Sequence, residues 1–141
     1  MLHHTVLRVI AKLLVPVILL FAFYVQFHGD YGPGGGFQAG VIFGAGIILY
    51  ALMFGLEEAR RVVPPRALEI LVAFGLLLYG SVGFAAILEG GNFLDYDVLA
   101  HDPHHGQHLG ILLVELGVGI TVAAVMATIF FLFAGRGRSD A

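Results

Sequence analysis

Four long apolar stretches constrain this chain more than any other feature. They cover residues 6–27, 37–56, 67–88 and 109–134 of the 141-residue sequence. Each is close to the 20 or so residues that carry a helix across the hydrocarbon core of a bilayer, whereas a membrane-spanning strand needs only about 9–11 residues. Because a backbone in lipid must satisfy its own hydrogen bonds, we expect an all-α, polytopic membrane protein with four transmembrane helices in a single domain, 1–141.

The composition supports a membrane protein and excludes several other classes. Hydrophobic residues make up 59% of the chain and charged residues 12%, against about 45–50% and 25% in soluble proteins. The absence of cysteine excludes disulfide scaffolds, zinc–thiolate sites and iron–sulfur clusters. A net charge of −3 leaves no basic surface for nucleic acid. No motif of an enzyme or of a nucleotide site is present, so we expect neither catalysis nor a cofactor.

The basic residues indicate the orientation in the membrane. All seven lie at the same side of the predicted helices, and the two connections on the other side, the loops 28–36 and 89–108, hold acidic residues but no Lys or Arg. The positive-inside rule therefore predicts that both termini are cytoplasmic and that these two loops are outside. An alternative interpretation of the first apolar stretch, 6–27, is a cleaved signal peptide. No small-residue cleavage site follows it, so we expect a transmembrane helix.

Glycines mark the connection between the first two helices and one face of the second. The loop 28–36 holds five glycines and Pro33, a composition typical of a tight turn. Gly36, Gly40 and Gly44 then recur every four residues and share one helix face, which allows another backbone to approach closely. The approaching helix would belong either to the same chain or to another subunit.

Glu115 is the most informative single residue, because it lies well inside the fourth predicted span. Burying a carboxylate in a membrane costs about 2.5–3.5 kcal/mol at the bilayer centre, so such residues often serve proton or cation transfer. Loss of hydration favours the protonated form, which would let the group exchange protons near neutral pH. The alternative is a carboxyl group that only hydrogen-bonds to a neighbouring helix or reaches water at the nearby outer surface.

Lys12 and Glu69 lie near the cytoplasmic ends of their predicted helices. Lys12 can extend its ammonium group to the inner surface. Glu69 follows Arg66 at the i,i+3 spacing of a surface ion pair. The alternative for each residue is a role in an ion path.

A histidine cluster stands out in the second outer loop. Imidazole groups at this spacing suit zinc, copper or nickel if the segment is helical, but Pro103 and Gly106 interrupt it. We therefore expect a solvated polar loop and no metal site, with a metal site or a pH-sensitive loop as the alternatives. The four histidines are His101, His104, His105 and His108.

The segment 28–40, His-Gly-Asp-Tyr-Gly-Pro-Gly-Gly-Gly-Phe-Gln-Ala-Gly, resembles the signature of a known family. It is similar to the B subunits (MnhB) of the multisubunit Mrp-type Na+/H+ antiporters, which show His-Gly and then Pro-Gly-Gly-Gly-Phe-Gln at the start of the second helix. The length, the four spans and the stretch 116–119 agree with this resemblance. The matching motif positions are Pro33, Gly34, Gly35, Gly36, Phe37, Gln38 and Gly40.

The resemblance implies a small accessory subunit of a hetero-oligomeric complex in the bacterial cell membrane. Such a complex exchanges Na+ for H+, and the B subunit supports its assembly and lines the cation or proton path. The candidates for that path are Glu115, Gln38, Lys12 and Glu69. Two alternatives remain open: the equivalent subunit of a membrane-bound hydrogenase-type complex related to complex I, and a free-standing metal sensor that uses the histidine loop.

Overall fold

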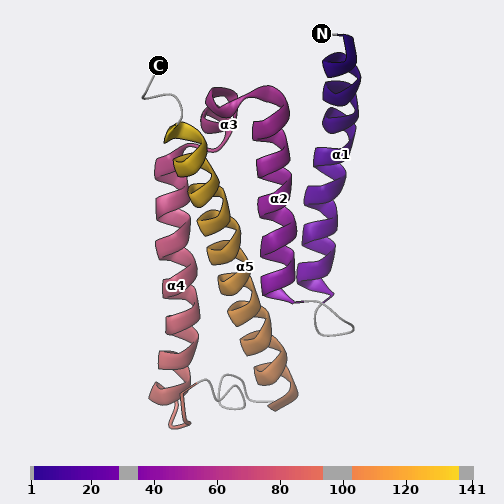
Figure 1. Cartoon of the computed structure of the whole chain (residues 1–141). Coiled ribbons are helices and arrows are strands. Elements are labelled where there is room, and N and C mark those ends of the chain that lie inside the picture. Colours follow the sequence, from indigo (N-terminus) through magenta and orange to yellow (C-terminus); the bar gives the residue numbers. More distant parts are fainter. Residues whose placement is uncertain (1, 29–34, 94–102, 137–141) are drawn as a thin grey trace.

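The computed structural model describes residues 2–28, 35–93 and 103–136, and this part of the chain is helical with no strand. This confirms the predicted all-α fold. The helices are α1 (Leu2–Phe27), α2 (Gly36–Phe54), α3 (Leu56–Val62), α4 (Pro65–Leu88) and α5 (Pro103–Arg136) (Figure 1).

Within the described residues, α1, α2, α4 and α5 are long and apolar enough to cross a membrane. Each contains one of the four predicted spans, apart from the last two residues of the second, which lie beyond Phe54. The main difference is at the start of α5, which begins at Pro103 inside the segment 89–108 that we expected to be loop. Proline does not interrupt this helix because it stands at its first position, where the missing N–H costs no hydrogen bond.

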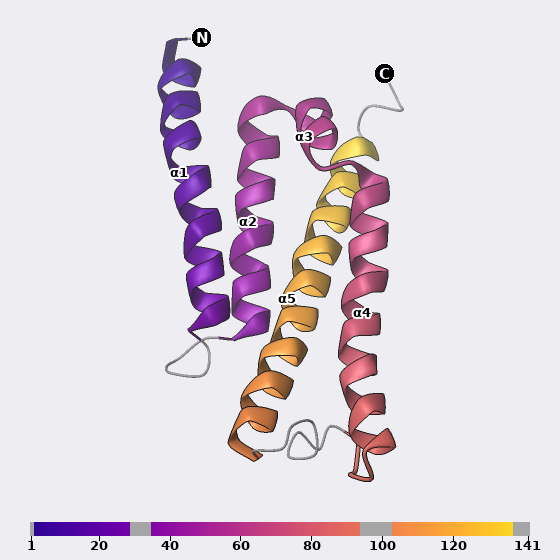
Figure 2. The same cartoon turned by 180° about the vertical axis from the view of Figure 1, so that it is seen from behind.

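The four long helices form a row in the order α1, α2, α5, α4 (Figures 1 and 2). Helix α2 packs against α1 on one side and α5 on the other, while α5 also packs along α4. Helices α1 and α4 therefore form the two edges of the row. The beginning of α1 and the end of α5 lie at the same end of the molecule, and the cytoplasmic location of that end stays a prediction.

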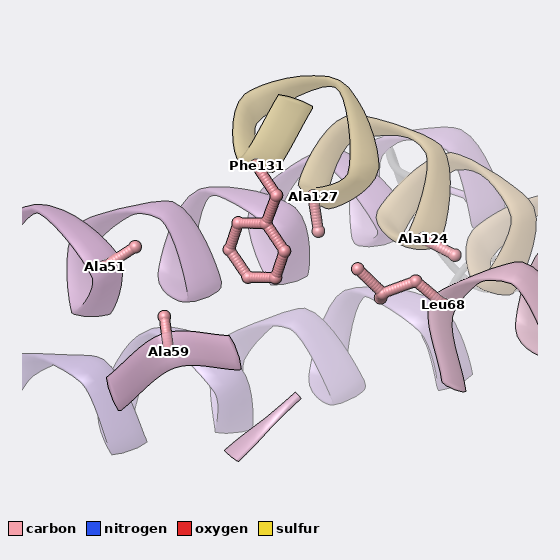
Figure 3. Packing of buried hydrophobic residues seen from close by; sticks show 6 residues of the cluster. All are labelled: Ala51, Ala59, Leu68, Ala124, Ala127 and Phe131. Carbon is pink, nitrogen blue, oxygen red and sulfur yellow. The ribbon is translucent and has the colours of Figure 1, made fainter. Parts of the chain in front are cut away.

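The polar connection after α2 contains the short helix α3. Gly55, with a φ of 100°, makes the turn into α3, and the Pro64–Pro65 pair ends the connection and begins α4. Ala59 of α3 is fully buried and packs with residues of α2, α4 and α5. It belongs to the main cluster of buried residues, which consists of Ala51, Ala59, Leu68, Ala124, Ala127 and Phe131 (Figure 3).

A side chain of α3 also bonds to the end of α5. Arg60 Nη2 donates a hydrogen bond of 3.1 Å to the backbone oxygen of Phe131. This contact adds a polar tie to the apolar cluster and joins the connection to the last turns of α5.

The glycine face of α2 packs against α5 within the same chain. A Cβ atom added to Gly40 would lie 2.7 Å from the carbonyl oxygen of Gly119, and one added to Gly44 would lie 3.3 Å from Met126 Cβ. A Cβ atom on Gly36 would overlap the backbone of Glu115. The helix that approaches this glycine face thus belongs to the same chain, which is the first of the two interpretations given above.

Many large apolar side chains point away from the row. Leu13 and Leu20 of α1 are 69% and 68% exposed, and Leu77 of α4 is 71% exposed. These residues lie on helices at the edges of the row, so their faces are available to lipid or to neighbouring membrane helices.

We predict that Gly40→Ala destabilises the protein, whereas Gly80→Ala does not. Both changes remove the unfavourable helix propensity of glycine, a gain of up to about 1 kcal/mol. At Gly40 the new methyl group meets the backbone of α5, and we expect a net loss of about 1–3 kcal/mol. At Gly80 no atom lies within 4 Å of the added Cβ. Thermal unfolding of the detergent-purified variants measures the difference, and equal unfolding temperatures would contradict this account of α2–α5 packing.

Candidate polar site at the α2–α5 contact

The structure places two of the four predicted ion-path residues together. A Cβ atom added to Gly35 would lie 3.3 Å from Glu115 Oε1 and 3.5 Å from Gln38 Oε1. The carboxylate of α5 and the amide of α2 therefore approach the same small space, which exists because residue 35 has no side chain. Glu115 is half-buried, whereas Gln38 is exposed.

Close backbone packing positions Glu115. Gly36 contacts the backbone of Glu115 so closely that a side chain at residue 36 would overlap it. Gly119, one turn further along α5, faces the backbone oxygen of Gly36. The start of α2 thus fixes this part of α5 and turns the Glu115 carboxylate toward Gly35.

A third polar side chain, which sequence reasoning missed, comes from α1. Gln26 is only 6% exposed, and its Oε1 atom lies 2.5 Å from the position of a Cβ on Gly119. Its Nε2 atom is buried and has no hydrogen-bond partner among the described residues. An unpaired buried amide group costs about 1–3 kcal/mol. The available signal was a lone glutamine at the end of an apolar helix, a residue type that rarely faces lipid.

A cavity of about 330 Å³ adjoins Gln26 and extends along α2 and α5. Gln26 is the one polar side chain among the described residues that line it, so the cavity continues the polar site into an apolar space. Leu68 and Leu71 of α4 also line it, and the lining residues of α1, α2 and α5 include Ala22, Phe23, Ala39, Gly40, Phe43, Gly119 and Ala123.

Lys12 and Glu69 do not join this site. The Lys12 ammonium lies 5.9 Å from the centre of the Phe54 ring, at the last residue of α2, whereas Glu115 lies beside the first. Glu69 is exposed and lines a separate hollow with Thr128. The two residues therefore lie toward the opposite end of the helices from Glu115.

The expected ion pair between Arg66 and Glu69 does not form in the described part of the chain. Arg61 Nη1 instead lies 2.9 Å from Glu58 Oε1, at the same i,i+3 spacing but on α3. Both partners are at least half exposed, so this pair contributes little to stability.

Part of the predicted turn and histidine cluster lies outside the described residues. This holds for Pro33, Gly34 and His101, and for the side chains of His104 and His105. His108 is exposed on α5, and Phe37 is 60% exposed at the start of α2. Among the side chains that the structure describes, no group of three potential metal ligands occurs. The absence of a metal site stays a prediction.

The fold and the polar site define a small multi-pass membrane protein in which helix packing gathers a carboxylate and two amides near one end. The family described as "Domain related to MnhB subunit of Na+/H+ antiporter" matches residues 6–128. Proteins named "Putative antiporter subunit mnhB2" from Staphylococcus aureus strains Newman, NCTC 8325 / PS 47 and COL are 38% identical over 140 residues, which covers 97% of this chain and 98% of theirs. The chain therefore belongs to the family of MnhB-related domains.

We predict that Gly36→Ala damages the fold more than Gly35→Ala. An alanine at residue 36 forces α2 and α5 apart, since its Cβ would overlap the carbonyl group of Glu115. Gly35 has an extended backbone, with a φ of −171°, and the nearest atoms to its new Cβ belong to the movable side chains of Glu115 and Gln38. The yield and unfolding temperature of the two purified variants test this order, and a less stable Gly35→Ala protein would contradict the packing described here.

Proposed function

We propose that this chain is a small accessory subunit of a multisubunit Na+/H+ antiporter in the bacterial cell membrane. The observation that carries this proposal is the family match over residues 6–128, together with relatives of the same length that are named as antiporter subunits. The same observation favours the antiporter over a hydrogenase-type complex. It also gives no support to a free-standing metal sensor.

The arrangement of polar groups supports an accessory role. Glu115, Gln38 and Gln26 lie near one end of the helices, while Lys12 and Glu69 lie toward the other. The cavity between these groups is lined by apolar residues apart from Gln26, as far as the structure describes it. Because ions need a continuous series of polar groups or water, the chain requires partner subunits to complete a path across the membrane.

The row of helices also supports assembly with partners. A closed bundle would direct the apolar faces of its helices inward, but here α1 and α4 form open edges with many exposed apolar side chains. We propose that the whole chain, 1–141, is one membrane domain whose exposed faces contact other subunits and lipid. Its two termini then lie in the cytoplasm, as the distribution of basic residues predicts.

Within this function, we assign Glu115 to the ion path and Gln38 to the same site. A carboxylate in a membrane-spanning helix binds Na+ or H+ through charge, and a neighbouring amide oxygen can contribute to the coordination of a cation. The two side-chain oxygens lie 3.3 and 3.5 Å from the place that a Cβ on Gly35 would take, so both face the same point beside the backbone.

We predict that deletion of the chain abolishes Na+-dependent H+ exchange in everted membrane vesicles and that its restoration on a plasmid recovers the exchange. The tagged chain should co-purify with several other integral membrane proteins encoded beside it. The purified chain alone, reconstituted in liposomes, serves as the control and should show no exchange. Exchange that persists after deletion, or a tagged chain that purifies without partners, would contradict the proposed function.

We predict that Glu115→Gln lowers the exchange rate roughly tenfold while the complex still assembles. The neutral side chain binds the transported ion more weakly, and a loss of about 1.4 kcal/mol of binding free energy corresponds to a factor of ten. Glutamine keeps the shape of the side chain and removes its charge. Glu89→Gln, at the exposed end of α4, is the matched control and should leave the rate unchanged. An unchanged Na+ dependence and pH profile in the Glu115→Gln vesicles would assign Glu115 to packing alone.

A further inference from the structure

Two cationic side chains of α1 converge on one aromatic ring of α2. The guanidinium carbon of Arg8 lies 5.4 Å from the centre of the Phe54 ring, and the ammonium nitrogen of Lys12 lies 5.9 Å from it. Arg8 and Lys12 are four residues apart, so they project from the same face of α1. The three side chains together form what we call the Arg8–Lys12–Phe54 cluster.

This cluster carries two positive charges that the described part of the chain does not neutralise. Among the described residues, the ion pair at this end of the molecule joins Arg61 to Glu58 of α3 and includes neither Arg8 nor Lys12. Both cationic side chains are exposed. Attraction to the ring is weak at exposed sites, and the two like charges repel each other. A bound anion would relieve that repulsion.

The depth of the cluster indicates which anion it meets. Helix α2 has 19 residues and ends at Phe54, so it is roughly 28 Å long, about the thickness of the hydrocarbon core. Phe54 therefore lies at the level where hydrocarbon gives way to lipid headgroups. Helix α1 continues past that level (Figure 1). The two cationic groups thus reach the layer in which phospholipid phosphates lie.

We propose that the Arg8–Lys12–Phe54 cluster binds the phosphate of an anionic phospholipid. The two cations contact the phosphate from one side, and the lipid chains run along the exposed apolar face of α1, which includes Leu13 and Leu20. Basic residues between membrane helices at the cytoplasmic surface are suited to such headgroups. This inference depends on the location in the membrane and not on the transport function.

The test measures the lipid that stays with the protein. The complex that contains the full chain is purified from nanodiscs of phosphatidylglycerol and phosphatidylcholine, and the phosphatidylglycerol that it retains is counted by native mass spectrometry. The double variant Arg8→Gln/Lys12→Gln should lose most of the retained phosphatidylglycerol, because both cationic contacts with the lipid phosphate are removed. The matched control is Arg61→Gln/Arg66→Gln, which removes two charges from the same end of the molecule and should retain the lipid.

Further variants separate the site from general charge and from folding. Arg8→Lys/Lys12→Arg keeps both charges and should retain the lipid. Phe54→Leu keeps the charges but removes the ring that holds them, and we expect intermediate retention; it decides the question if the double variant does not assemble. Equal retention by the wild type and the double variant, or by the wild type and Phe54→Leu where only that variant assembles, would overturn the proposal. An equal loss from the Arg61→Gln/Arg66→Gln control would also overturn it.

Inorganic phosphate distinguishes a lipid from a free anion. Added to the wild-type complex in nanodiscs of phosphatidylcholine alone, it should not bind at the cluster, because the proposed contacts include the lipid chains. Binding of inorganic phosphate that is lost in the double variant would show a site for a free anion and overturn the lipid proposal.

Discussion

The close contact between α2 and α5 is the constraint on which the rest of the structure depends. At Gly36 and Gly40 the two backbones approach so closely that no side chain fits between them. Such contacts matter in a membrane, where lipid is as apolar as the helix surface and association relies on packing. With α2 and α5 joined, α1 and α4 pack on the outer sides of this pair and produce a row of helices. The glycines thus determine both the architecture and the place of Glu115 beside Gln38.

The same arrangement explains why the subunit suits a larger assembly. A row leaves its edge helices with one face covered and the other exposed, and exposed leucines of α1 and α4 occupy these faces. At one end, Arg60 and the buried Ala59 attach α3 to the last turns of α5. Near the other end, the polar side chains gather around Gly35. The chain therefore combines exposed apolar edges with a small polar site near one end, and we propose that partner subunits supply the remainder of the ion path.

The outcome of the sequence predictions follows from the range of the interactions involved. The four helices were predictable because an apolar run of about 20 residues has one stable form in lipid. The start of α5 at Pro103 was missed because proline breaks a helix in its interior but not at its first position. Gln26 was missed because its environment depends on Gly119, far away in the sequence. The Arg66–Glu69 spacing permitted an ion pair, yet Arg61 and Glu58 formed one instead.

By itself, the amino-acid sequence determined that this protein is helical, that it crosses the membrane and which family it belongs to, since these properties depend on local hydrophobicity and on a contiguous motif. Only the tertiary structure decided which residues meet. A glycine stripe defines one face of a helix but does not identify the helix that packs there. The choice of α5 as the neighbour of α2 brought Glu115 to Gly35 and Gln26 to Gly119, and it left Lys12 and Glu69 toward the opposite end. Helix order in a membrane is set by the fit of whole surfaces, which no short segment of sequence contains.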